Sequence, residues 1–209
     1  MKKLVSLGLA LVTAFSIAMP VSAAKMEVGA KIDLPISTAA KAATTWKNVA
    51  TVFTCFKQGE PYSDGPACVR MALWVLNGKD YGESAIRTGC GTTQHGTNIN
   101  DMRVYLNYKS ATKYGTFMKN SLTQTEFQNK IYNSIVNKHA PVILLVCQEV
   151  GSWPSGVAKL KHHYIVVRAI SSDKTKLKIA DPFYNSKDYY EVSTDTAYQA
   201  LYQVLAAAS

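Results

Sequence analysis

The hydrophobic period changes along this chain, and that change constrains the fold more than any other feature. In "DGPACVRMALWVLNG", apolar residues recur every three or four positions on nearly all sides. This predicts a buried helix that begins near Pro66 and ends at Asn77-Gly78. A second helix is predicted within residues 123–139, which open with the capping-box pattern Thr123-x-x-Glu126. Pro141 marks the end of this helical part.

Beyond Pro141 the pattern is typical of strands. "PVILLVCQEV", "HYIVVRAI", "KLKIADPF" and "YYEVS" are short β-branched or aromatic runs between turn residues. The last segment, "TAYQALYQVLAAAS", predicts a final helix with Ala197, Leu201, Val204 and Leu205 on one face. Helices followed by strands predict an α+β domain, in which a helical half packs against an antiparallel sheet and a site lies between them.

The N-terminus has the pattern of a secretory signal peptide over residues 1–23. Lys2 and Lys3 precede an apolar stretch, and small residues follow Pro20. The apolar stretch is short for a retained anchor, so we expect a secreted, periplasmic or cell-envelope protein without stable membrane insertion. We expect residues 24–51 to form a leader segment and residues 52–209 to form the domain.

Charge and cysteine content exclude several classes of protein. Without Lys2 and Lys3, the remaining 21 basic and 14 acidic residues give a net charge of +7. These basic residues are dispersed, which argues against nucleic-acid binding. The spacing of the four cysteines matches no zinc motif. The four cysteines could form disulfides in any of three full pairings, or they could be buried free thiols, and the sequence does not distinguish these alternatives. We expect no cofactor and no metal, and the oligomeric state is open.

A histidine and an aspartate mark a candidate site at the end of the predicted sheet. His163 opens one predicted strand and Asp181 closes the next. A hairpin centred on Ser172 would pair residues whose numbers add to 344, which places His163 directly opposite Asp181. We therefore expect their side chains to meet on one face. The other interpretation is a surface pair without function.

The order of several motifs resembles that of a known family. The chain is similar to papain-like cysteine peptidases of the double-glycine, bacteriocin-processing type (cysteine peptidase family 39-like). The similarity starts with Gln58, which is followed after five residues by position 64 and Gly-Pro-Ala. It continues in the same order with "GTTQHGTNINDM", "HAPVILLV", "HYIVV" and "IADPFY". The resemblance covers about residues 52–205. It implies a papain-like fold, with Gln58 in the oxyanion hole, His163 as general base and acid, and Asp181 orienting the imidazole.

The chain departs from this family at the nucleophile. The resemblance places a catalytic cysteine directly before Gly-Pro-Ala, where this chain has Asp64. An aspartate caps a helix well but is a poor nucleophile towards an amide. Cys68 is the alternative nucleophile, but one helical turn displaces it by about 6 Å. Asp64, His163 and Asp181 together could also hold a divalent metal, which is the weakest of these hypotheses.

The sequence therefore favours a peptide-binding pseudoenzyme over an active hydrolase. The ligand would be a peptide or a cell-wall peptide segment in the cleft. Trp153, Tyr62 and Tyr164 are candidate ligand contacts, although Trp153 fits core packing equally well. The alternative function is a cysteine peptidase or amide hydrolase that uses Cys68 with His163 and Asp181.

Overall fold

The computed structural model describes residues 43–183 and 189–208. The predicted signal peptide and most of the predicted leader lie outside these residues. The elements follow in this order: β1 (Trp46–Asn48), α1 (Asp64–Asn77), α2 (Glu83–Gly89), α3 (Ile99–Lys109), β2 (Tyr114–Met118), a 3-10 turn (Lys119–Ser121), α4 (Gln124–Tyr132), a π-helical turn (Asn133–Asn137), β3 (Val142–Val146), β4 (His163–Ser171), β5 (Lys176–Ala180), β6 (Tyr190–Ser193), α5 (Thr194–Ala200) and β7 (Leu201–Ala207).

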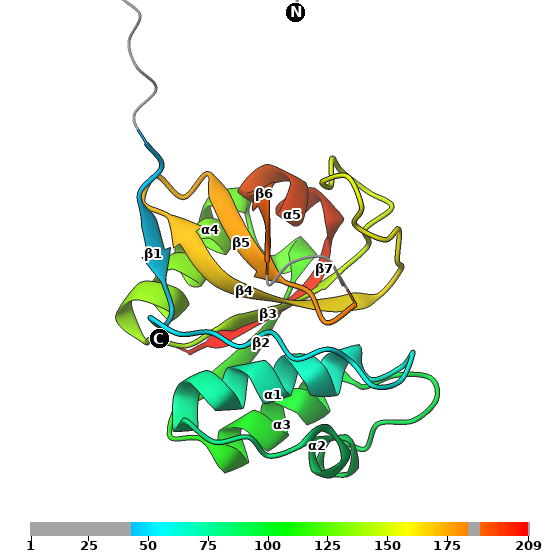
Figure 1. Cartoon of the computed structure of the whole chain (residues 1–209). Coiled ribbons are helices and arrows are strands. Elements are labelled where there is room, and N and C mark those ends of the chain that lie inside the picture. Colours follow the sequence, from blue (N-terminus) through cyan, green and yellow to red (C-terminus); the bar gives the residue numbers. More distant parts are fainter. Residues whose placement is uncertain (1–42, 184–188, 209) are drawn as a thin grey trace, which may run out of the picture. The chain divides into compact units, whose positions relative to one another are not determined.

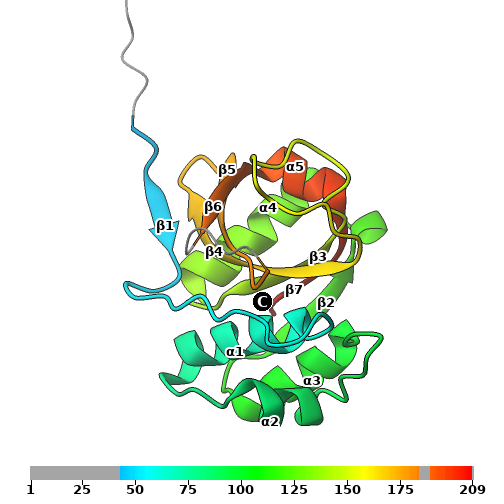
Figure 2. The same ribbon diagram turned by 45° about the vertical axis from the view of Figure 1, so that its right-hand side comes forward.

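The strands form one seven-stranded antiparallel sheet in the order β2-β7-β3-β4-β5-β6, with β1 paired to β4. Helices α1, α2 and α3 lie together on one side of this sheet, whereas α4 and α5 lie on the other (Figure 1). The view turned by 45° shows the same separation (Figure 2). The predicted α+β class, with a helical half on an antiparallel sheet, is confirmed.

Local sequence explains where the helices begin and end. Helix α1 ends at Gly78, whose φ of 62° is the left-handed conformation that glycine adopts readily. Thr123 and Glu126 form the predicted capping box at the start of α4. The side chain of Asn98 accepts a hydrogen bond from the backbone of Asn100 at the start of α3.

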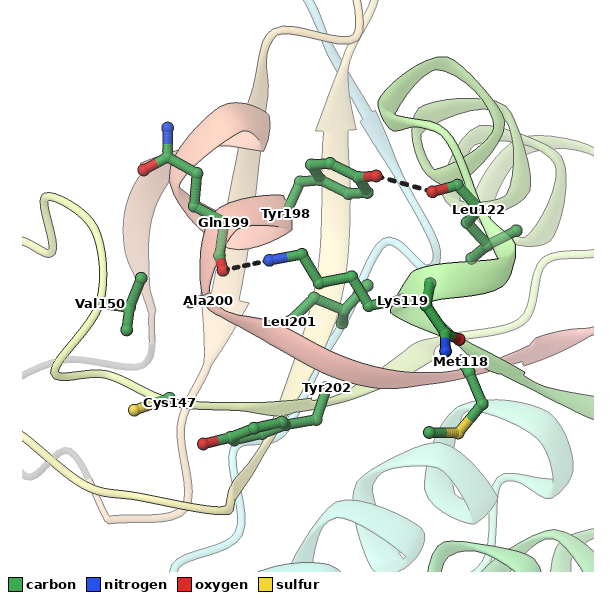
Figure 3. Close-up of a pocket in the computed structure, with 11 residues that line it drawn as sticks. Met118, Lys119, Leu122, Cys147, Val150, Tyr198, Gln199, Ala200, Leu201 and Tyr202 are labelled. Carbon is green, nitrogen blue, oxygen red and sulfur yellow. Dashed lines mark hydrogen bonds between the residues drawn. The ribbon is translucent and has the colours of Figure 1, made fainter.

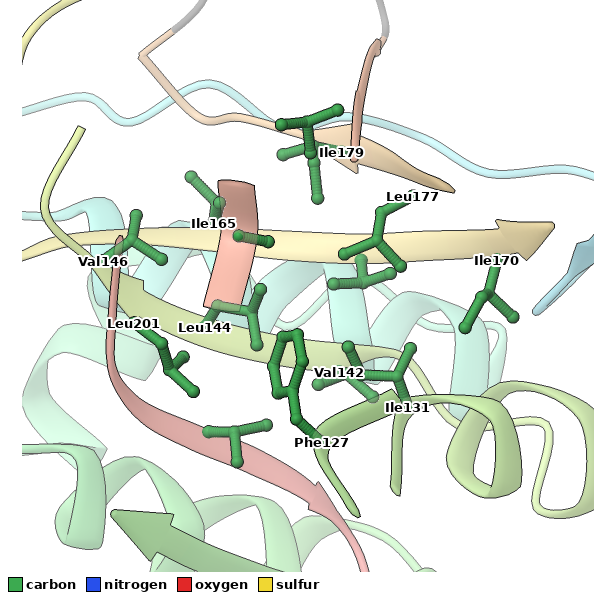
Figure 4. Packing of buried hydrophobic residues seen from close by; sticks show 14 of the residues in the cluster. Phe127, Ile131, Val142, Leu144, Val146, Ile165, Ile170, Leu177, Ile179 and Leu201 are labelled. Atoms are coloured by element: carbon green, nitrogen blue, oxygen red, sulfur yellow. The ribbon is translucent and has the colours of Figure 1, made fainter. Parts of the chain in front are cut away.

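Two hydrophobic cores cover the two faces of the sheet. One lies under α4 and α5 and includes Phe127, Leu144, Ile165 and Leu177 (Figure 4). The other joins α1 and α3 to the opposite face, and Cys68, Met71 and Met102 are buried in it. Helix α1 is thus held against the sheet by its apolar surface, which fixes the position of its N-terminus.

Two expectations about the strands are wrong. The predicted last helix is α5 only as far as Ala200, and Leu201–Ala207 form β7 between β2 and β3. Tertiary pairing with two neighbouring strands overrides the helical spacing here. In addition, β4 and β5 pair Val166 with Ala180, not in the expected register, and the register shifts again further along.

Residues 43–51 belong to the segment that we expected to be a leader, and β1 within them pairs with β4 of the sheet. None of the helices within residues 43–183 and 189–208 combines the length and the hydropathy needed to cross a bilayer.

Candidate active site

Three elements bring three ionisable side chains together. Helix α1 begins at Asp64, β4 begins at His163, and Asp181 directly follows β5. His163 Nδ1 lies 3.0 Å from Asp64 Oδ2, and His163 Nε2 lies 2.8 Å from Asp181 Oδ1. The imidazole is therefore held from both sides, between the helical half and the sheet.

The contact between His163 and Asp181 forms by a register other than the one we expected. Extending the pairing of β4 and β5 by one residue sets Asp181 opposite Ile165, two positions from His163 on the same face. Diagonal neighbours of this kind are within reach of long side chains. The two residues thus meet as diagonal neighbours, and not as directly opposite ones.

Asp64 accepts hydrogen bonds only. Its Oδ1 receives the backbone N–H of Gly65 at 2.9 Å, and its Oδ2 receives the backbone N–H of Tyr164 at 2.9 Å. The third donor is the His163 ring. The positive end of the α1 dipole also favours a carboxylate at this position.

Asp181 is surrounded by four donors. Its Oδ1 accepts from His163 and from the backbone N–H of Phe183 at 2.9 Å. Its Oδ2 accepts from Gln148 Nε2 at 3.1 Å and from the Tyr190 hydroxyl at 3.0 Å. Burial on its own would raise the pKa of Asp181, but the bond to His163 and these other donors hold that pKa below its usual value.

The hydrogen bonds define the protonation state of His163. Each ring nitrogen faces a carboxylate oxygen, which is the arrangement in which an imidazolium donates from both nitrogens. Burial would lower the pKa of His163, but the bonds to Asp181 and then to Asp64 outweigh it and raise the pKa to about 9. The cluster therefore holds two negative charges and one positive charge near neutral pH.

Within the described residues, the side chains of Gln58 and Cys68 make no hydrogen bond to Asp64, His163 or Asp181. Gln58 Nε2 donates to the carbonyl oxygen of Glu60 at 2.9 Å, and its Oε1 is buried without a partner among the described residues. Cys68 is completely buried in the core on α1. Burial, followed by the charges of Asp64 and Asp181, raises the pKa of the Cys68 thiol well above its usual range.

The three candidate ligand contacts have different surroundings. Trp153 is buried, donates its indole N–H to the Val150 carbonyl oxygen and packs edge-on against Tyr190. Tyr62 lies under Arg87, whose guanidinium donates to the Tyr62 hydroxyl. Of the three, Tyr164 alone lines the cavity beside Asp64. Its hydroxyl donates to the Thr97 carbonyl oxygen.

That cavity has a volume of about 300 Å³ and opens between α1, α3 and the sheet. Its lining is mainly polar and comprises Asp64, His95, Gly96, Thr97, Asn98, Ile99, Asn100, Leu145, His162, Tyr164 and Gln203. Its volume is at the small end of the range for ligand sites, about 300–1,000 Å³. It suits one side chain or one end of a peptide.

A second cavity, of about 530 Å³, shares no lining residue with the first. It is mainly apolar and lies between β7, α5 and the segment after β3, where Cys147, Leu201 and Tyr202 border it (Figure 3). Lys119 Nζ, which also borders it, donates to the Gln199 carbonyl oxygen. No member of the histidine cluster lines this second cavity.

Sequence reasoning missed Gln148 and Tyr190, which support Asp181. Gln148 is completely buried two residues beyond β3, and Tyr190 opens β6. The signal for Gln148 was a single uncharged polar residue just after an apolar strand, which also fits an ordinary turn.

Among the described residues, no group of three or more His, Cys, Asp or Glu side chains could hold a metal ion.

Several solved structures share this fold at low sequence identity. The peptidase domain of Streptococcus ComA, a bifunctional ABC transporter, matches with a TM-score of 0.51 and 19% identity, over 75% of this chain and all of that one. A putative C39-like peptidase from Bacillus anthracis matches at 0.54 and 8%, over 77% and 96%. The Carica candamarcensis cysteine protease CMS1MS2, solved with E-64, matches at 0.54 and 11%, over 79% and 98%.

These likenesses confirm the papain-like fold. A search of curated proteins finds no match. The model of the Peptidase_C39 like family matches residues 40–209, which is most of the chain and includes Asp64, His163 and Asp181. The chain therefore belongs to the Peptidase_C39 like family.

Proposed function

We propose that this chain is an exported peptide-binding pseudoenzyme, which keeps the cleft of a cysteine peptidase and lacks its nucleophile. The observation that carries the proposal is the 3.0 Å contact between His163 Nδ1 and Asp64 Oδ2. It puts a carboxylate next to the imidazole, at the helix N-terminus where the family resemblance implies a cysteine. Export rests on the signal-peptide pattern of residues 1–23.

The chemistry of Asp64 argues against hydrolysis. A nucleophilic cysteine attacks a carbonyl carbon as a thiolate, and its histidine then passes a proton to the leaving amine. A carboxylate held by three donors is a weak nucleophile. His163 is fixed between two carboxylates, so its protons are already engaged on both sides. The cluster supports a stable arrangement of charges and not a proton shuttle.

Cys68 is the alternative nucleophile, and its surroundings disfavour that role. A reactive thiolate needs exposure and a lowered pKa. Cys68 is completely buried and the pKa of its thiol is raised. Both ring nitrogens of His163 are bonded to carboxylates and are unavailable to the Cys68 thiol. We therefore assign Cys68 to core packing.

Replacing Asp64 with cysteine tests the proposal. The mature protein is incubated with a peptide mixture and cleavage is followed by mass spectrometry, for the wild type, D64C, D64A and C68A. We expect no cleavage by the wild type, D64A and C68A, and cleavage by D64C that E-64 blocks. In D64C, the introduced thiol should also react with iodoacetamide near pH 6 at least about tenfold faster than Cys68.

The opposite pattern would overturn the proposal. Cleavage by the wild-type protein that disappears in C68A would identify Cys68 as the nucleophile. Cleavage by the wild type and C68A that disappears in D64A would show that Asp64 itself supports hydrolysis. D64A serves as the matched control for D64C, because it removes the same carboxylate without supplying a thiol.

A further inference from the structure

The buried cluster carries an uncompensated negative charge. Asp64 and Asp181 are ionised, and only the His163 imidazolium lies between them, which leaves a net charge of −1. The α1 dipole offsets about half a unit charge at its N-terminus. Lys57 Nζ lies 3.3 Å from the backbone carbonyl oxygen of Asp181, and within the described residues the ion pair of Asp64 is with His163 and not with Lys57. The side of Asp64 keeps a negative excess.

The negative charge of Asp64 is exposed to solvent in the cavity of about 300 Å³. Asp64 is its only lining residue that carries a permanent charge near neutral pH, since no lysine, arginine or glutamate belongs to the described residues that line it. The other lining side chains that can make hydrogen bonds are amides, hydroxyls and imidazoles, with Asn98, Gln203, His95 and His162 among them. The cavity is therefore an anionic spot on a chain whose formal net charge is +9.

Asp64 has capacity for one more donor. Its two oxygens receive three hydrogen bonds, from Gly65, Tyr164 and His163, whereas a carboxylate offers about four acceptor positions. A carboxylate or phosphate in the cavity would face repulsion from Asp64. An ammonium group would supply both the missing positive charge and the missing donor, in a partly desolvated place where such a pair is stronger than in water.

We infer that the cavity beside Asp64 binds the positively charged amine of a peptide, either its N-terminal α-ammonium or the end of a lysine side chain. This inference rests on the proposed function and names the chemical class of the ligand. Asp64 would then bind the ligand at the position where the family resemblance implies a cysteine that attacks the substrate. The neighbouring imidazolium keeps Asp64 in place but cannot neutralise both carboxylates.

Short peptide probes test the inference on the mature, isotope-labelled protein by NMR titration. The probes are Ala-Ala-Ala amide with a free N-terminus, its N-acetylated form, the N-acetylated peptide with a free C-terminal carboxylate, and N-acetyl-Ala-Ala-Lys amide. Backbone amides of Gly96, Thr97 and Tyr164 report on the cavity, and those of Val150 and Leu201 report on the separate apolar cavity.

We expect the two probes with an ammonium group to bind at least about tenfold more tightly than the acetylated amide, since a charge-assisted hydrogen bond contributes about that much. The shifts should appear at Gly96, Thr97 and Tyr164, and not at Val150 or Leu201. The difference between the free N-terminus and the lysine probe identifies the source of the amine. D64N should abolish the preference, whereas D101N, which changes an exposed aspartate on α3, should retain it.

A second pair of variants serves in case D64N does not fold. Gln203 lines the cavity from β7 and takes no part in the histidine cluster. Q203K should weaken binding of the ammonium probes and Q203E should strengthen it. The inference is overturned if the acetylated amide binds as tightly as the ammonium probes, or if the carboxylate probe binds more tightly than they do. It is also overturned if no probe shifts the backbone amides at the cavity. Cleavage by the wild type would instead overturn the proposed function, so the two failures are distinguishable.

Discussion

The two carboxylates beside His163 occupy different environments. Asp181 lies on the sheet side, where its side chain is 3% exposed and receives four donors. Asp64 lies at the N-terminus of α1, where its side chain is 12% exposed, receives three donors and borders a cavity. Both bond the same imidazole at similar distances. Distance to His163 therefore does not separate their roles.

The difference in burial and in the number of donors gives the two carboxylates different roles, one in supporting His163 and one in contacting a ligand. A buried carboxylate with four donors can lose none of them without leaving a polar group unpaired. A carboxylate at the wall of a cavity can exchange water for a ligand, because solvent already reaches it. Asp181 therefore holds the imidazolium in place, whereas Asp64 presents the cluster to the cleft.

The largest expected effect compares alanine at the two positions. D181A should lower the free energy of unfolding by about 3–5 kcal/mol, because it removes the buried acceptor that His163, Phe183, Gln148 and Tyr190 share. D64A should cost about 1–2 kcal/mol, since water in the cavity can replace the lost acceptor. Urea unfolding at pH 7 measures both. An equal or larger cost for D64A would contradict the comparison.

A smaller effect is expected when a charge is placed beside Asp181. Q148E sets a second carboxylate against Asp181 Oδ2 in a buried position, and it should cost about 2–3 kcal/mol at pH 7. The cost should diminish at pH 5, because a protonated glutamate can donate to Asp181. Q199E is the matched control, because it sets a carboxylate against Asp195 Oδ2 at an exposed position, and it should cost less than about 0.5 kcal/mol. Unfolding of Q148E that differs little from the wild type at pH 7 would show that Gln148 does not support Asp181.

An effect similar in size to that of Q148E is the dependence of stability on pH. The pKa of His163 is raised from 6.5 to about 9 in the folded protein, so its contribution is complete below pH 6.5 and is lost as the pH rises through 9. Unfolding at a series of pH values should show a decline of about 3 kcal/mol between these limits, because each pKa unit corresponds to about 1.4 kcal/mol. The pKa of Asp181 is lowered, so its contribution is present above its usual pKa of 3.8 and is lost in stronger acid. H163Q should remove the alkaline decline, and a decline that persists in H163Q must come from other groups.

Sequence periodicity predicted the elements that carry their own local signals. The central helix, the capping box at Thr123 and the four strand runs after Pro141 all lie where expected. It failed for Leu201–Ala207, whose spacing fits a helix but whose place between β2 and β3 requires a strand. It also failed for the register of β4 with β5, because a bulge shifts the pairing and the sequence does not mark it.

The sequence by itself determined the order of the motifs, the aspartate at position 64 and the family that these indicate. Only the tertiary structure decided that both nitrogens of His163 are bonded by carboxylates, that Gln148 and Tyr190 enclose Asp181, and that Asp64 borders a cavity whose described lining residues include no lysine or arginine. The physical reason is that charge balance depends on which groups lie within hydrogen-bonding distance. Residues 64, 148, 163 and 181 come that close only when α1 packs on the sheet.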